Sequence, residues 1–252
     1  MFENKKNEIM AVVAGNRGAG VTWFGTALSQ AFAYQHQKTL FFDADGGAEN
    51  IAYQMGLKKS NLYADMLKGH ITINHAVTTF SKGKFDLIYA NPNEPLLNGY
   101  SIGRSQILAL DLKNLASKYD DLILDCSGAD TFLKNILIST ASSLILIVEP
   151  GNAGAVGAYE EIERLKKIVP NTKIFVVVNH ALTMAEGEQV FKTIADAASD
   201  FMNVSLDLLG VICQDGRIRE CINNKMTLWE RYPVSELLEQ LSKMTERLKQ
   251  GD

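Results

Sequence analysis

Short apolar runs recur along the chain, separated by stretches in which apolar residues have helical spacing. Six runs are rich in aliphatic and β-branched side chains and nearly continuous in apolar character: residues 9–14, 39–43, 85–90, 121–125, 143–148 and 173–178. A seventh run of this kind lies at residues 208–212. Such runs are typical of parallel strands that are buried on both faces of a sheet.

Helical patterns lie between these runs, at residues 21–34, 105–118, 153–168 and 187–201. The alternation implies right-handed crossovers between parallel strands, with helices on both faces of the sheet. The chain is therefore predicted to be a three-layer α/β protein built on a mainly parallel, twisted sheet.

The chain has 252 residues, of which 46% are hydrophobic. No low-complexity tract, internal repeat or Pro/Gly-rich linker divides the sequence. Because α/β folds of about 250 residues are often single domains, we expect a short N-terminal tail at residues 1–8 and one domain at residues 9–252.

The formal net charge is −4 and the basic residues are dispersed. The densest basic group, at residues 164–167, lies on a predicted helix and is interpreted as a solvated face. Nucleic acid is therefore not an expected partner. The three cysteines, Cys126, Cys213 and Cys221, have no CxxC spacing and are expected to be reduced thiols.

The longest uninterrupted apolar run, residues 144–148, is far shorter than the roughly 20 residues that span a bilayer. The N-terminus is charged and lacks the apolar region of a signal peptide. We therefore expect a cytoplasmic protein whose membrane contact is at most peripheral.

The most informative segment, residues 14–22, reads Ala-Gly-Asn-Arg-Gly-Ala-Gly-Val-Thr and joins an apolar run to an amphipathic one. Its three glycines let the backbone fold tightly so that successive N–H groups point inward, towards an anion. A phosphate-binding loop normally has Lys immediately before its Thr or Ser, but here Val21 precedes Thr22. The sequence predicts a phosphate-binding loop that lacks its usual cation.

Polar residues also follow other predicted strands, at the edge where parallel sheets bind ligands. Asp125 could hold a Mg²⁺-bound water while Thr22 binds the metal directly. Asp43 and Asp45 lie on one side of an extended segment, so that one could approach the metal and the other could position water. The amide of Asn179 could bind an adenine edge. For each residue, a turn former or a helix cap is the alternative interpretation.

Together these segments resemble the MinD/ParA group of P-loop ATPases, and within it the MinD-like flagellar-placement regulators called FlhG or FleN. The resemblance runs from about residue 9 to residue 248. The family loop reads roughly Gly-Lys-Gly-Gly-Val-Gly-Lys-Thr, so Asn16 and Val21 replace both of its lysines. The resemblance implies a MinD-like P-loop NTPase fold.

Other segments resemble further motifs of the family. Its Asp-x-Asp-x-Gly-x-x-Asn block is similar to Asp43, Asp45, Gly47 and Asn50, and its switch segment is similar to residues 122–128. Its base-contacting Asn resembles Asn179, and its Gly-x-Ile-Pro-x-Asp motif resembles residues 210–215, with Cys213 in place of the proline.

The resemblance implies ATP or ADP with Mg²⁺ as the bound group. Asp45 would be the catalytic residue that positions water if the protein is active, and Thr22, Asp43 and Asp125 would hold the metal. The implied nucleotide-binding residues are Gly15, Asn16, Arg17, Gly18, Ala19, Gly20, Val21, Thr22, Trp23, Asn179 and Asp215.

The missing lysines lead us to expect that nucleotide binding is weakened or lost. A unit charge about 4 Å from a phosphate contributes on the order of 4 kcal/mol at an effective dielectric constant of 20. Arg17 is the nearby cation, and a guanidinium can bind phosphate through two hydrogen bonds.

By analogy with the family, we expect a regulator or scaffold in the placement of flagella or of another polar machinery, with weak or lost ATP hydrolysis and with protein partners. One alternative is an active Mg-ATPase switch in which Arg17 replaces the loop lysines. A further alternative is a pilus-localisation protein of the TadZ/CpaE kind.

In the family, the first loop lysine reaches the phosphates of a second protomer. With Asn16 at this position, the resemblance implies that ATP does not drive a homodimer, unless a MinD-like relative supplies the lysine in a heterodimer. The apolar stripe of the C-terminal segment aligns with the family's last packing helix, and we expect a core helix there rather than a membrane anchor; its residues are Leu237, Leu238, Leu241, Met244 and Leu248.

Overall fold

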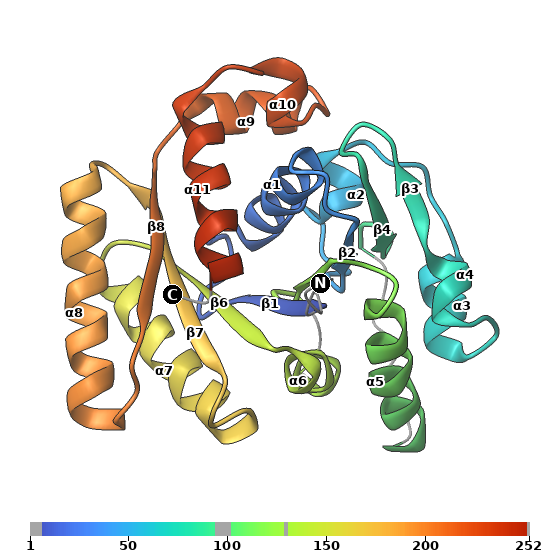
Figure 1. Ribbon diagram of the computed structural model, residues 1–252, viewed down its shortest axis with the longest axis horizontal. Coiled ribbons are helices and arrows are strands. Elements are labelled where there is room, and N and C mark those ends of the chain that lie inside the picture. The colour runs from blue at the N-terminus through green and yellow to red at the C-terminus, as the bar shows by residue number, and fades with distance from the viewer. Residues whose placement is uncertain (1–6, 94–101, 129–130, 251–252) are drawn as a thin grey trace, which may run out of the picture.

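The computed structural model describes residues 7–93, 102–128 and 131–250. In this part of the chain a central sheet lies between two layers of helices (Figure 1). The expected N-terminal tail at residues 1–8 is largely outside the described residues, and its last residue, Glu8, begins the first strand.

The described residues form one eight-stranded sheet in the order β3-β4-β2-β5-β1-β6-β7-β8. Its neighbours are parallel except β3 and β4, which are antiparallel. The strands are β1 (Glu8–Ala14), β2 (Thr39–Asp43), β3 (Thr78–Phe80), β4 (Phe85–Tyr89), β5 (Asp121–Asp125), β6 (Ser143–Val148), β7 (Lys173–Ala181) and β8 (Asp207–Cys213). The predicted three-layer, mainly parallel α/β fold is confirmed.

The two faces of the sheet carry different helices. One face is covered by α1 (Val21–Tyr34), α2 (Ile51–Gln54), α9 (Gly216–Asn223), α10 (Leu228–Arg231) and α11 (Glu236–Gln250). The other is covered by α3 (Leu62–Lys68), α4 (Ile73–Ala76), α5 (Ile102–Ala116), α6 (Thr131–Thr140), α7 (Asn152–Ile168) and α8 (Met184–Met202).

Period-two alternation of side chains along each strand fills both hydrophobic cores. In β1, Met10 and Val12 pack on the α1 side, whereas Ala11 and Val13 pack on the α7 side. This two-sided burial explains why the strand sequences are nearly continuous apolar runs rather than alternating ones.

The seven predicted strands and four predicted helices are present, with ends that differ by a few residues. The edge strand β3 and the helices α2, α4 and α10 were not predicted, because segments of three or four residues show too little of either period. The longer helices α3, α6 and α9, of seven to ten residues, were not predicted either. The predicted C-terminal core helix is confirmed, since α11 buries its apolar stripe against α1 and β8. None of the helices in the described ranges is both long and apolar enough to cross a bilayer.

Candidate functional site

The loop between β1 and α1 has the geometry of a phosphate-binding loop. Gly20 precedes α1 with φ 91°, a left-handed conformation that favours glycine. Among the described residues no side chain caps the first turn of α1, which leaves its backbone N–H groups facing the loop. At Gly15 a side chain would collide with the backbone of Gly157 in α7, so the loop also lies tightly against α7.

Neither residue at the two lysine positions of the loop carries a charge. Asn16 turns towards α7, where its Nδ2 donates a hydrogen bond to the carbonyl oxygen of Ala153 at 2.9 Å. Val21 is only 4% exposed and belongs to the apolar core under α1. The backbone of a phosphate-binding loop is therefore present without either of its usual ammonium groups.

The remaining loop residues differ in exposure. Arg17 and Gly18 are exposed, and Arg17 makes no hydrogen bond or ion pair with any other residue that the structure describes. Ala19 is buried and its carbonyl oxygen accepts a hydrogen bond from Asn179. Trp23 is buried in the first turn of α1 and lines a small cavity with residues of α9 and α10, including Cys221 and Leu228.

Thr22, Asp43 and Asp125 form the centre of the site. Asp43 and Asp125 end the neighbouring strands β2 and β5 and are partners in the sheet register. Thr22 Oγ1 donates to Asp125 Oδ2 at 2.5 Å, and Ser127 donates to Asp125 Oδ1 through its backbone N–H and its hydroxyl. The predicted set of a hydroxyl and two carboxylates thus meets at one edge of the sheet.

Both carboxylates are completely buried. Burial raises the pKa of Asp125, and burial together with the charge of Asp125 raises the pKa of Asp43 well above its usual range. Within the described ranges, no Lys, Arg or His side chain is hydrogen-bonded or ion-paired to either carboxylate. The two buried carboxylates thus have no cationic partner among the described residues.

Hard oxygen ligands with uncompensated negative charge fit Mg²⁺, which is usually held by one or two carboxylates together with phosphate oxygens and water. Thr22 and Asp125, which are hydrogen-bonded to each other, would be two of the protein ligands of the metal. Asp43, on the neighbouring strand, would be the third. The residues present therefore suit Mg²⁺ as well as the loop backbone suits phosphate.

Asp45 lies between two strand ends. Its Oδ1 accepts the N–H of Gly47 at 2.7 Å, and its carboxylate fills the space that a side chain at Gly128 would occupy. Asn50 caps α2 and donates to the carbonyl oxygens of Asp45 and Ala90. Asp45 is thus held next to the strand ends that carry Asp43 and Asp125, while Asn50 is a structural residue of the same loop.

Asn179 lies near the end of β7, and Asp215 lies between β8 and α9. Nδ2 of Asn179 donates to Ala19 at 2.8 Å, while its buried Oδ1 has no partner among the described residues. Asp215 caps α9 and binds both Nε and Nη2 of Arg217, whose hydrogen bonds lower the pKa of Asp215. The structure brings Asn179 to the loop, whereas the carboxylate of Asp215 is already engaged within its own segment.

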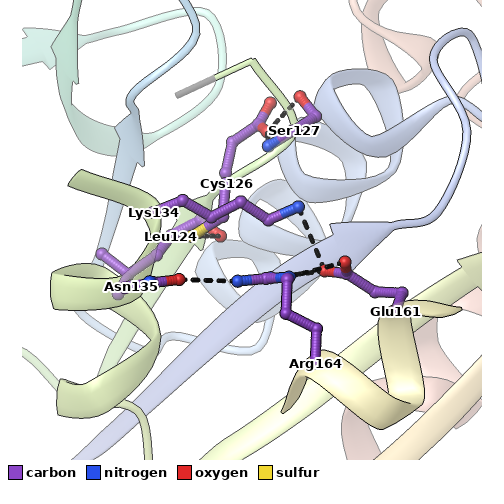
Figure 2. Close-up of polar contacts among 8 residues, drawn as sticks. Leu124, Cys126, Ser127, Lys134, Asn135, Glu161 and Arg164 are labelled. Atoms are coloured by element: carbon purple, nitrogen blue, oxygen red, sulfur yellow. Dashed lines mark hydrogen bonds and ion pairs between the residues drawn. The ribbon is translucent and has the colours of Figure 1, made fainter. Parts of the chain in front are cut away.

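A second charged cluster, which the sequence analysis missed, joins α6 to α7 below the end of β5 (Figure 2). Lys134 and Arg164 converge on Glu161 at 3.0 Å and 2.6 Å, and Arg164 also donates to Asn135. The Glu161 side chain is only 7% exposed. The interpretation of residues 164–167 as a solvated face is wrong for Arg164, which is partly buried, because it pairs with the buried Glu161 and donates to Asn135 on the neighbouring helix α6.

A comparison with protein families matches residues 7–184 to the AAA domain family AAA_31. Among curated proteins, the chain is 23% identical to the antiactivator FleN of Pseudomonas aeruginosa over 229 residues, covering 91% of this chain and 81% of FleN.

Solved structures share the fold. The septum site-determining protein MinD of Pyrococcus horikoshii, complexed with Mg-ADP, superposes with a TM-score of 0.74 at 20% identity, covering 96% of this chain and 95% of that one. The MinC:MinD cell division complex of Aquifex aeolicus gives a TM-score of 0.74 at 19% identity, with coverages of 97% and 96%.

Proposed function

This chain belongs to the AAA domain family AAA_31 and is of the MinD/ParA type, and from this premise we propose that it is a MinD/FleN-like nucleotide-binding protein whose ATP hydrolysis is weak or lost. It acts as a regulator or scaffold in the placement of flagella or of another polar machinery. The process is taken from its similarity to FleN.

One observation carries the biochemical part of the proposal. The loop backbone, the helix N-terminus and the oxygens of Thr22, Asp43 and Asp125 form a site for a Mg-nucleotide, yet Val21 leaves it without a cation for the phosphates. Charge on the transferred phosphoryl group needs such a cation in the transition state. We therefore expect that the replacement of the loop lysine by Val21 abolishes ATP hydrolysis and weakens nucleotide binding less severely.

Titration of the purified protein with ATP and with ADP, each with and without Mg²⁺, tests binding by calorimetry. We expect weak, Mg²⁺-dependent binding and negligible phosphate release. Turnover comparable to that of an intact MinD-like ATPase, abolished by Asp45→Ala, would contradict the loss of hydrolysis.

The second candidate is a working ATPase in which Arg17 replaces the lysines. The observation that favours it is the exposed guanidinium of Arg17, which no described residue engages. Under this alternative, Arg17→Ala abolishes both turnover and nucleotide binding.

The position of Asn16 leads to an expectation about ATP-dependent dimerisation. Its amide is hydrogen-bonded to α7 of its own chain and carries no charge to offset two facing polyphosphates. We expect that Mg-ATP does not shift the protein from monomer to dimer in light scattering, and that mixing with a lysine-bearing relative does. An ATP-dependent homodimer would favour the ATPase candidate.

A further inference from the structure

Aromatic and basic side chains gather where the C-terminal end of α1 meets α10 and the turn between β3 and β4 (Figure 1). The rings of Tyr34 in α1 and Trp229 in α10 are stacked, with their centroids 5.5 Å apart. Nζ of Lys84, which precedes β4, lies 4.0 Å from the ring centroid of Tyr34. Three segments that are far apart in the sequence thus share this surface.

The same surface continues towards α2 through two more lysines. Nζ of Lys82 donates to the carbonyl oxygen of Lys225 at 3.4 Å, and Nζ of Lys225 lies 3.7 Å from the ring centroid of Tyr53. Tyr34 and Tyr53 are 41% and 45% exposed. We call these six residues the basic aromatic patch: Tyr34, Tyr53, Lys82, Lys84, Lys225 and Trp229.

The positive charge of the patch is only partly compensated. Within the described ranges, neither Lys84 nor Lys225 forms an ion pair with a carboxylate. Lys82 lies 3.8 Å from Oε1 of Glu230, whose Oε2 accepts the backbone N–H of Thr227. The patch is therefore positive on a chain whose formal net charge is −4, and it favours an anionic partner.

The aromatic rings narrow the choice of anionic partner. Bases of a single-stranded nucleic acid stack on open ring faces, but the ring of Tyr34 already has Trp229 and Lys84 against it. A lipid-binding surface usually gathers roughly four to eight basic residues, and the patch has three lysines. Tyrosine and tryptophan are enriched at protein interfaces. The patch therefore suits a protein segment whose carboxylates meet the lysines and whose apolar side chains contact the exposed parts of the rings.

We propose that the basic aromatic patch binds an acidic segment of a protein partner, one in which apolar side chains accompany the carboxylates. Lys84 and Lys225 would donate to carboxylate oxygens, and Tyr34 and Trp229 would contact the apolar side chains. None of the patch residues belongs to the candidate nucleotide site. The inference therefore goes beyond the proposed function and does not require a bound nucleotide. Because salt screens attraction between exposed charges, the binding should weaken as ionic strength rises.

Titration of the full chain, without nucleotide, against a fluorescein-labelled peptide tests the inference by anisotropy. The probe is Glu-Glu-Leu-Glu-Glu-Phe-Glu-Glu, and the same peptide with Gln in place of every Glu is its uncharged counterpart. We expect the wild type to bind the acidic peptide more tightly than the uncharged one. Lys84→Gln and Lys225→Gln should each weaken binding of the acidic peptide about two- to fivefold, as for an exposed ion pair, and the double variant should lose more than either.

Lys192→Gln is the matched control, because Lys192 is an exposed lysine of α8, on the opposite face of the sheet. It removes the same charge and should keep the wild-type affinity. No binding of the acidic peptide, or an equal loss in Lys192→Gln, would overturn the inference.

Two further probes separate a protein partner from the other anionic ones. They are phosphatidylcholine vesicles with about 30% phosphatidylserine and a DNA duplex of about 20 base pairs. We expect neither to bind in a way that depends on Lys84 and Lys225. Tighter binding of either probe than of the acidic peptide, lost in Lys84→Gln and Lys225→Gln, would overturn the inference, because the patch would then serve a lipid or a nucleic acid.

Discussion

Two groups of buried carboxylates in this protein differ in whether cationic side chains are paired with them. Glu161 has Lys134 and Arg164 as partners, and although burial opposes its ionisation, their hydrogen bonds and charges lower its pKa below the ordinary 4.5. Asp43 and Asp125 are more deeply buried, have no described cation beside them, and have raised pKa values. The first group is a structural ion pair; under the proposed function, the positive charge at the second group would come from bound Mg²⁺.

We expect the largest loss of unfolding free energy when Glu161 is removed from its cluster with Lys134 and Arg164. Glu161→Ala leaves Lys134 and Arg164 partly buried without their carboxylate, and we expect a loss of about 3–5 kcal/mol of unfolding free energy. Urea unfolding measures it. Lys167→Ala, which breaks the exposed pair with Glu163, is the control and should cost about 0–1 kcal/mol. Equal effects of the two variants would show that the cluster behaves as a surface pair.

A lysine in place of Val21 should supply the positive charge that the phosphate-binding loop lacks. Val21→Lys places an ammonium group at the start of α1, and we expect roughly a hundredfold tighter binding of Mg-ATP, or about 2.7 kcal/mol. Calorimetry measures the gain. Val234→Lys, at a 93% exposed position, adds the same charge elsewhere and should leave the affinity unchanged. No gain in Val21→Lys would mean that the pocket is closed to phosphate.

Removing the ionisable group of Asp125 from its pair with Asp43 should stabilise the metal-free protein. The pKa of Asp125 is raised in the folded state, so its destabilising effect is absent below its ordinary value of 3.8 and grows as the pH rises through the folded-state pKa. Asp125→Asn keeps the side-chain shape and can still bond to Thr22, and we expect about 1–2 kcal/mol of added stability at pH 7 in EDTA.

The pH dependence of urea unfolding checks this sign. Wild type should lose stability towards higher pH, and Asp125→Asn should show a smaller slope, whereas Asp200→Asn on the exposed face of α8 should match the wild type. Glu161 acts in the opposite direction, because its lowered pKa makes its contribution disappear only as the pH falls below about 4.5. If stability rises with pH in the wild type and not in Asp125→Asn, the pKa of Asp125 is lowered on folding rather than raised.

Arg17 should have the smallest effect. Its side chain is exposed and makes no hydrogen bond or ion pair with another described residue, so Arg17→Ala should change the unfolding free energy by less than about 0.5 kcal/mol. We also expect the thermal shift caused by Mg-ATP to remain, since a ligand stabilises the native state only through its affinity for it. Arg219→Ala is the exposed control. Loss of the shift in Arg17→Ala alone would favour the ATPase candidate.

The local pattern of the sequence was sufficient for the fold and for much of the site. Apolar periodicity located the seven strands and the main helices, since burial on both faces of a sheet requires that pattern at each strand separately. The expected convergence of the loop with Asp125 and Asn179 followed from strand order, because the carboxyl ends of parallel strands share an edge.

Other features depended on contacts that no local pattern contains. Lys134 and Glu161 are on different helices, so neither segment alone indicates a buried ion pair. The basic aromatic patch depends on contacts of α1 with α10 and with the β3–β4 turn, and the direction of Asn16 depends on α7. The sequence by itself determined which residues carry charge and which strands carry them to the edge; the tertiary structure decided which charges meet a partner, because burial and pairing are properties of distance in space.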